Sequence, residues 1–451
     1  MSTFLNESNK TRMFLIKIGQ ILGKISFSKN LYHFITYLIF PSRLYENLIC
    51  PNIAFYFFWI LWPFYFFAKK KKLSFLINNM TFSPGQATME LDYFFRRLHV
   101  GDIASDRKYI VVWPSNWLIS DVASDLKKMY HSKFYLFIVN DFLYYLLLPL
   151  FSRFPDIVCD CGISLQNCLI IDENGKIRSK TFPFLQSAKR SFLEYTEVNK
   201  HYNILQSQTP GFCPMRPDYP MTWKLLDFLA EVMTKYAVIQ IRNSRVNGTL
   251  VPTDPLTYVE TIEFLKKNGF GVVFAGREIM PEIFSDLGVL NYANWEGASF
   301  FHDLQLIASS AFVLSSASGF STMADTMEIP MVYSNNWVPS QSTPGRFTIC
   351  VPTLLHNYDG RLMRFIEQID YSRKTLGSNN YYDLDKVTLK PRVATSRELL
   401  EATKEALFLG NSFQAPSDLQ SQYKSLMTGT PFYFAGSRIS QYFIESHQNL
   451  L

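Results

Sequence analysis

Four short apolar runs between residues 236 and 336 limit what this chain can fold into more than any other feature. They are YAVIQI, FGVVFA, AFVLS and MVYS, which start at residues 236, 270, 311 and 331. Runs of four to six apolar residues are typical of strands buried on both faces of a parallel sheet. The segment after the first run has helical spacing at Tyr258, Ile262 and Leu265 and is followed by Gly269, where a helix C-cap belongs. This order predicts a β-α-β-α-β unit.

A polar cluster follows each apolar run. In open α/β sheets, ligands bind outside the carboxyl ends of the strands, so we expect these clusters to share one site for an anionic ligand. The candidate donor- or phosphate-binding residues are Arg242, Ser244, Gly276, Arg277, Ser316, Ser318, Gly319, Ser321, Thr322, Asn335 and Asn336.

The serine-rich cluster, residues 315–319, precedes a segment with helical character, residues 320–327. Free backbone N–H groups at a helix N-terminus favour phosphate. The competing interpretation is an ordinary serine-rich helix cap.

Arg242 follows a fully apolar strand, where a cation is costly unless it meets an anion, and Arg277 follows the next strand. A structural salt bridge to Glu278 or Asp254 is the alternative for each arginine. We interpret Arg242 as a catalytic as well as a phosphate-binding residue.

The chain's charge is unevenly distributed. Its 451 residues carry a formal net charge of +6. Residues 1–72 hold ten lysines and arginines but two acids, so the remainder is slightly acidic. A slightly acidic body lacks the positive face that binding to phosphate backbones requires, which argues against a nucleic-acid partner.

The N-terminal segment predicts contact with a membrane. Residues 53–68 form an apolar run that four lysines follow, and residues 13–25 are amphipathic. Sixteen helical residues span about 24 Å, which is shorter than the hydrocarbon core of a bilayer, and positive charge flanks the run on both sides. We expect peripheral or re-entrant attachment through residues 13–72 at the cytoplasmic face of the inner membrane; a single crossing and a buried helix are the alternatives. No signal peptide is evident.

Neither a metal site nor a disulfide framework is expected. The six cysteines have no paired spacing, and Cys159, Cys161 and Cys168 lack a fourth ligand. Asp383 and Asp385 lie in a polar loop that prepares no ligand geometry.

A second α/β region precedes the first. It is predicted from a strand at residues 109–113, a loop at 114–116 and a helix after it, and Asn174-Gly175 marks a hairpin turn. Helices are predicted at 396–409 and 437–450. The expected organisation is a membrane-associated segment (1–75), an acceptor-side Rossmann-like domain (76–220), a nucleotide-sugar-binding Rossmann-like domain (221–375) and a helical tail (376–451) that packs back on the N-terminal domain.

Residues 220–345 and the last fifteen residues resemble a bacterial family of glycosyltransferases associated with surface-polysaccharide loci. The resemblance lies in VIQIRNSRVNG, TDPLTYVETIEFLKKNGFGVVFAG, FFHDLQLIASSAFVLSSASGFSTMADTMEIPMVYSNNW and GSRISQYFIESHQNLL. It implies a GT-B-like architecture in which two Rossmann-like domains face a cleft. The family's His-x-Arg-Asp pattern stands here as Gln240-Ile241-Arg242-Asn243, which keeps the arginine and loses both flanking groups.

Sugar transfer from a nucleotide sugar needs stabilisation of the departing phosphate and, for inversion, a base on the acceptor hydroxyl. Arg242, Arg277 and the serine cluster meet the first need, and Asp121 is the candidate base; its alternative role is to favour a helix N-terminus. We therefore expect a metal-independent glycosyltransferase without a cofactor, acting on a glycan or lipid-linked acceptor. A sugar-nucleotide epimerase, a polyol-phosphate transferase and an inactive nucleotide-sugar-binding scaffold are the alternatives.

Overall fold

The structure is a computed structural model. It describes residues 63, 65–77, 84–103, 106–115, 135–140, 158–160, 169–171, 177–179, 201–202, 204–216, 221–232, 235–242, 253–316, 318–336, 345–377, 389–410, 414–428, 433 and 436–451.

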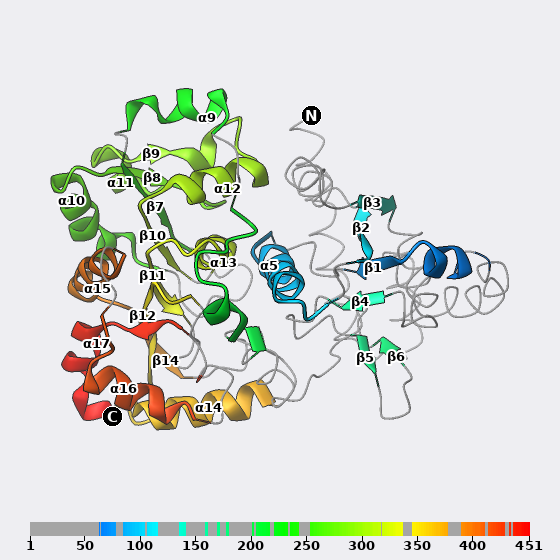
Figure 1. Ribbon diagram of the computed structural model, residues 1–451. Helices are drawn as coiled ribbons and strands as arrows, with labels where there is room; N and C mark the ends of the chain where they lie inside the picture. Colours follow the sequence, from blue (N-terminus) through cyan, green and yellow to red (C-terminus); the bar gives the residue numbers. More distant parts are fainter. Residues whose placement is uncertain are drawn as a thin grey trace, which may run out of the picture.

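Two parallel sheets form two α/β lobes, which confirms the predicted fold class (Figure 1). The N-terminal sheet has the order β3-β2-β1-β4, and each of its strand pairs is parallel. Its strands are β1 (Leu73–Ile77), β2 (Lys108–Ser115), β3 (Tyr135–Asn140) and β4 (Val158–Asp160). Strands β5 (Leu169–Ile171) and β6 (Ile177–Ser179) pair antiparallel, as the expected hairpin requires.

The C-terminal sheet has the order β15-β12-β11-β10-β7-β8-β9 and is parallel throughout. Its strands are β7 (Tyr236–Gln240), β8 (Gly271–Phe274), β9 (Leu290–Asn291), β10 (Phe312–Ser316), β11 (Met331–Asn336), β12 (Thr348–Pro352) and β15 (Arg438–Ile439). β13 (Leu354–His356) and β14 (Lys390–Arg392) form a separate antiparallel pair.

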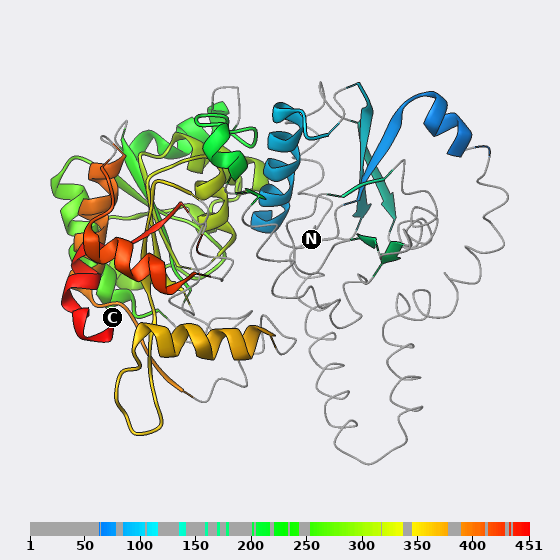
Figure 2. The same cartoon turned by 60° about the horizontal axis from the view of Figure 1, so that its bottom comes forward.

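Helices cover both faces of the C-terminal sheet, as Figures 1 and 2 show. They are α9 (Trp223–Phe228), α10 (Val259–Lys267), α11 (Glu282–Asp286), α12 (Phe300–Ser309), α13 (Gly319–Thr326), α14 (Phe365–Gly377), α15 (Ser396–Leu409), α16 (Asp418–Leu426) and α17 (Gln441–Ser446). Short 3-10 turns are η3 (Leu229–Glu231), η4 (Pro255–Tyr258), η5 (Tyr292–Asn294) and η8 (Gln448–Leu450).

Alternation along the strands divides the core in two. Val238 and Val313 point to the face covered by α12 and α13, where side chains of α5 (Pro84–Val100) join the same cluster. Ile239 and Leu314 point to the opposite face, covered by α10, α15 and α17. This two-sided burial explains why the strands read as continuous apolar runs.

Several helix boundaries match the predictions. α15 spans residues 396–409, and its capping box joins Thr395 to Glu398. After α10, Gly269 has φ +77°, which is a left-handed conformation that favours glycine at a helix C-terminus.

Other boundaries differ from the predictions. β2 extends through Ser115, because Pro114 and Ser115 pair with β3. β9 has only two residues, too few for a periodic signal. The predicted helix at 437–450 is divided into β15, α17 and η8, since Arg438 and Ile439 add to the edge of the sheet.

The described helices of the C-terminal tail lie on the C-terminal lobe. α15 packs against β11, β12 and α10, and α17 packs against α15 and α16. The tail therefore completes the second lobe here, whereas we expected it to return to the first.

The expected membrane-associated segment lies mostly outside the described residues. Within the described part, no helix combines the length and the apolar character needed to span a bilayer.

Candidate functional site

The two lobes meet where α5 packs against α13. α5 follows β1, and α13 follows β10. A Cβ atom placed on Gly85 would lie 2.4 Å from the Cα of Gly319, and one placed on Gly319 would lie 3.1 Å from the backbone nitrogen of Gly85. The first turns of both helices are thus in backbone contact, which a larger residue at position 85 would prevent (Figure 1).

The C-terminal sheet reverses its strand order between β7 and β10. From β7, the chain builds outward through β8 and β9, then returns to place β10 on the other side of β7. Such a reversal is the place where open α/β sheets bind ligands. Gln240 ends β7 and pairs in register with Ser315 of β10, so these two side chains stand at the switch point.

Four polar residues at this point form a hydrogen-bonded group, which we call the Gln240 cluster: Gln240, Ser315, Ser316 and Ser318. The Ser315 hydroxyl donates to Gln240 Oε1 at 2.9 Å, and the Ser316 hydroxyl reaches the same oxygen at 3.4 Å. The hydroxyls of Ser315 and Ser318 are 3.1 Å apart. Gln240 Nε2 donates to the carbonyl of Ile241 at 2.8 Å.

Burial divides the cluster into an inner and an outer part. Gln240, Ser315 and Ser316 are buried, whereas Ser318 is half-buried. Gly276, at the end of β8, has φ +110°, and a Cβ there would lie 3.1 Å from Gln240 Cγ. The inner residues therefore shape the floor of the site, and contacts with a ligand fall to groups farther along the chain.

The N-terminus of α13 is the part of the site best prepared for an anion. Ser318 is the N-cap residue, and its backbone N–H donates to the Ser321 hydroxyl at 3.2 Å. The hydroxyls of Ser321 and Thr322 donate to the Ser318 carbonyl at 2.7 and 3.3 Å. Gly319 is the first residue of the helix, and its missing side chain leaves room for the backbone of Gly85 on α5.

The two candidate arginines differ in setting. Arg242 is half-buried directly after β7, and its carbonyl accepts the Thr253 N–H at 2.7 Å. The chain thus leaves the sheet at Arg242 and returns beside it. Arg277 is exposed, one strand farther from the switch point. Asp121 and Ser244 lie outside the described residues.

Asn335 and Asn336 were expected to follow β11, but they are its last residues. Asn335 has φ +51° at an irregularity in the pairing of β11 with β12, and its Oδ1 accepts the Ala394 N–H at 2.8 Å. This asparagine joins β11 to the segment that enters α15.

A second hydrogen bond accompanies Asn335. Its neighbour Ser334 lies 2.9 Å from the Tyr258 hydroxyl, and burial raises the pKa of Tyr258 to about 12. Since Tyr258 belongs to the core on the α10 side, the amide end of β11 is separated from the Gln240 cluster by the sheet.

Behind the contact of the two lobes, α5 carries a buried ion pair. Arg96 Nε donates to Asp92 Oδ2 at 2.8 Å, and the Tyr202 hydroxyl donates to the same oxygen at 2.6 Å. Arg96 Nη1 donates to the hydroxyl of Thr209 at 2.6 Å and to its carbonyl at 3.2 Å. These bonds fasten α5 to residues 201–216, the segment that leads into the C-terminal lobe.

Neither this ion pair nor the role of Gly85 was predicted from the sequence. Pro84-Gly85 after an apolar strand is a detectable turn signal, but nothing local indicates that Gly85 approaches Gly319. In the described part of the chain, no three His, Cys, Asp or Glu side chains gather as a metal site would need.

Matches to known proteins are found among solved structures, and their sequence identities are low. No family model matches the chain, and no curated protein does. Among solved structures, it is similar to a glycosyl transferase family 9 protein from Veillonella parvula DSM 2008, at 11% identity over 75% of this chain and 98% of that one, with a TM-score of 0.43. It is also similar to E. coli heptosyltransferase WaaC with ADP-2-deoxy-2-fluoro heptose (14% identity, 62% and 93% covered, TM-score 0.37). A UDP-N-acetylglucosamine 2-epimerase matches at 12% identity, with 77% and 99% covered and a TM-score of 0.35.

Proposed function

We propose that this chain is a glycosyltransferase that moves a sugar from a nucleotide sugar to a glycan or lipid-linked acceptor in surface-polysaccharide synthesis. The observation that supports it most is the α13 N-terminus, which stands at the switch point of the C-terminal sheet and faces α5 of the other lobe. A donor phosphate bound there would place its sugar between the two lobes.

In this proposal, leaving-group stabilisation comes from the chain itself, without a metal. The N–H groups at the start of α13 and the Arg242 guanidinium would hold the diphosphate as negative charge develops on it. Ser318 and Thr322, both half-buried, would add hydroxyl contacts. Asp121 remains the proposed base for the acceptor hydroxyl, and the proposed location is the cytoplasmic face of the inner membrane.

The test is a thermal-shift screen with sugar nucleotides and free nucleoside diphosphates. A ligand at a hundred times its Kd stabilises the native state by about 2.7 kcal/mol, which raises Tm by a few degrees. We expect at least one diphosphate to do so, and Arg242→Ala to remove most of the shift. Arg364→Ala is the matched control, because Arg364 is exposed directly before α14.

One observation favours a second candidate, an inactive nucleotide-sugar-binding scaffold. Gln240 stands where the glycosyltransferase family that the sequence resembles has a histidine, and its side chain does not titrate. Its amide oxygen accepts a hydrogen bond from the Ser315 hydroxyl, and its amide nitrogen donates to the Ile241 carbonyl. A scaffold would show the Arg242-dependent thermal shift yet release no free nucleotide with any donor and acceptor extract. If no diphosphate shifts Tm, both candidates are wrong.

A further inference from the structure

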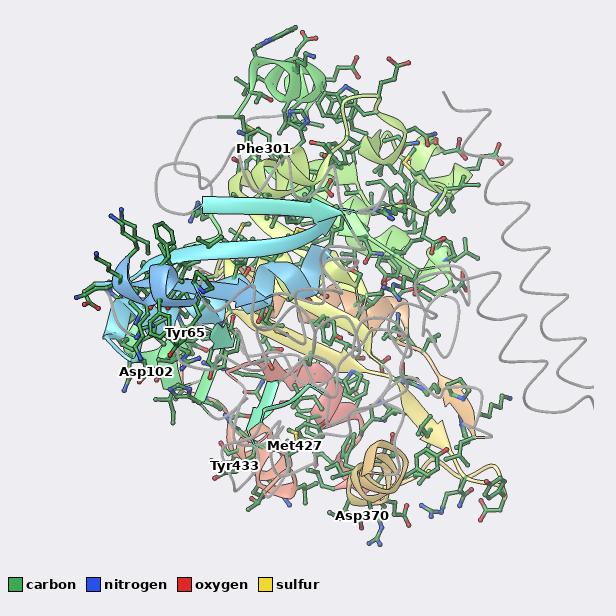
Figure 3. The ribbon with its side chains drawn as sticks, turned by 90° about the vertical axis from the view of Figure 1, so that its right-hand side faces the viewer. Tyr65, Asp102, Phe301, Asp370, Met427 and Tyr433 are labelled. Carbon is green, nitrogen blue, oxygen red and sulfur yellow. The ribbon has the colours of Figure 1, made fainter. Side chains whose placement is uncertain are left out.

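A cluster of exposed aromatic and basic residues lies at the far end of the N-terminal lobe. We call it the aromatic–lysine patch: Phe66, Phe67, Lys69, Lys70, Lys71 and Lys72. Phe66 and Phe67 are each 53% exposed, although Ala68 between them and the lysines is fully buried. Residues 65–70 are helical, and Ala68 is buried while both phenylalanines are exposed. Figure 3 looks onto this side of the molecule and places Tyr65 there.

The four lysines are held where the helix turns into β1. The Lys71 N–H donates to the Phe67 carbonyl at 2.9 Å, and Lys72 has φ +53°, which ends the helix. Lys69 Nζ lies 5.6 Å from the centre of the Tyr65 ring. Lys72 is paired with Asp106, but both side chains remain largely exposed, and Lys70 and Lys71 are exposed as well. Positive charge is therefore concentrated beside exposed aromatic rings.

This combination fits the interface of an anionic bilayer. Aromatic rings enter the boundary between headgroups and acyl chains, while lysine side chains extend to the lipid phosphates. Each lysine near an anionic surface contributes roughly a fivefold gain in partitioning at physiological salt. A protein surface of acidic character would match the lysines but leave both phenylalanines without an apolar counterpart.

We propose that the aromatic–lysine patch docks this chain on a bilayer that contains anionic lipids. The inference deepens the proposed function, on which it rests for the membrane-face location. It assigns the contact to six described residues and fixes the orientation of the lobes relative to the lipid.

The orientation follows from the direction of the strands. The patch precedes the amino end of β1, and Lys108 at the amino end of β2 is paired in register with Leu73. β1 leads to α5 and the contact with Gly319, so the carboxyl ends of the sheet point away from the patch (Figures 1 and 2). The eight residues of β2 span roughly 26 Å at 3.3 Å per residue. The patch and the contact of α5 with Gly319 therefore lie at opposite ends of the N-terminal sheet.

The experiment is flotation of the full chain with vesicles of phosphatidylcholine alone or with about a third phosphatidylglycerol. We expect binding to the anionic vesicles, and a loss of about thirtyfold in Lys70→Gln/Lys71→Gln from the two removed charges. Lys267→Gln/Lys390→Gln removes two exposed lysines of the C-terminal lobe and should leave binding unchanged. Phe66→Ser/Phe67→Ser should weaken binding, whereas Trp223→Ser/Leu226→Ser, which removes exposed apolar side chains on α9, should not.

Each other outcome overturns the proposal. Equal binding to neutral vesicles would show that binding does not depend on the charge of the lipid. Wild-type binding by both patch variants would place the contact elsewhere in the chain. No vesicle binding together with capture by an acidic protein would identify a protein partner. Nucleotide release in detergent-free solution separates this result from the proposed function, since the patch variants should keep it.

Discussion

Asp92 and Glu398 are both buried carboxylates paired with an arginine, yet their pKa values move in opposite directions. Burial raises the pKa of Asp92 from 3.8 to about 6, although Arg96 and Tyr202 oppose the rise. Burial also works against ionised Glu398, but hydrogen bonds from His447, Arg392 and the Thr395 N–H lower its pKa from 4.5 to about 2. The comparison shows that more hydrogen-bond donors can outweigh the effect of burial and keep a buried carboxylate stable when charged.

The donors differ in a way that can be located atom by atom. Both oxygens of Glu398 are used, since His447 and Arg392 bond Oε1 at 2.9 and 2.8 Å, and Thr395 N–H and Arg392 bond Oε2 at 2.8 and 3.2 Å. Asp92 accepts its bonds at Oδ2, and among the residues that the structure describes neither its buried Oδ1 nor Arg96 Nη2 has a hydrogen-bond partner. Glu398 thus anchors the C-terminal lobe, while the Asp92 pair leaves the joint between the lobes under-satisfied.

The largest expected effect is the fall in stability when the arginine of each pair is replaced. Arg96→Met should lower the free energy of unfolding by about 3–5 kcal/mol, because it leaves the buried Asp92 without its cation. Arg392→Met should cost about 1–2 kcal/mol, since Glu398 keeps the donors His447 and Thr395. Denaturant unfolding at pH 7.5 measures both. Equal losses would contradict the comparison.

Arg96→Met has a functional consequence as well. The ion pair lies two to three turns after Gly85 on α5, the helix whose first turn touches Gly319. We expect the variant to need a higher concentration of nucleoside diphosphate than the wild type for a half-maximal thermal shift. Arg392→Met should show the wild-type value.

The second effect is the pH dependence that Asp92 imposes. Its folded pKa lies above its unfolded pKa, so between pH 4 and 6 the native state holds a proton that the unfolded chain has lost. Stability should therefore fall as pH rises from about 4 to about 6, by about 2–3 kcal/mol at 1.36 kcal/mol per pKa unit, and stay flat above. The groups that face Asp92 are Arg96, Tyr202 and Glu328.

Asp92→Asn tests this slope. The variant should have a shallower pH dependence than the wild type between pH 4 and 6, whatever its overall stability, in urea titrations at half-unit intervals. Identical slopes would show that Asp92 stays ionised across this range in the native state.

Glu398 should show the opposite sign in a lower window. Its folded pKa lies below its unfolded pKa, so its contribution is complete above about pH 4.5 and is lost as pH falls toward 2. We expect about 2 kcal/mol of stability to disappear in this range, and Glu398→Gln to flatten it. A wild-type acid transition in Glu398→Gln would contradict the assignment.

The same contrast explains which parts of the site could be predicted from the sequence. The ends of β7 and β10 could be located, because their apolar runs revealed where the strands end, but the hydrogen bond that joins Gln240 to Ser315 was not predicted. The sequence predicts that Asn335 lies near the end of β11, but it does not predict the direction of its side chain. That direction is set by the hydrogen bond with Ala394, which lies 59 positions away in the sequence. The Asp92 pair could not be predicted, because Tyr202 is 110 positions away and helical periodicity alone makes Asp92 and Arg96 an ordinary surface pair.

The smallest effect isolates the second donor of Asp92. Tyr202→Phe removes the hydroxyl that bonds Oδ2 at 2.6 Å and leaves the ring in its edge contact with Tyr93. A hydrogen bond to a charged group contributes about 1.5 kcal/mol or more, so the variant should be less stable by about that amount at pH 7.5, where Asp92 is ionised. At pH 4.5, where Asp92 is protonated, the loss should be smaller, and the pH range of falling stability should extend above 6. Because Arg96 remains in place, a loss equal at both pH values would mean that the hydroxyl acts through packing and not through the charge of Asp92.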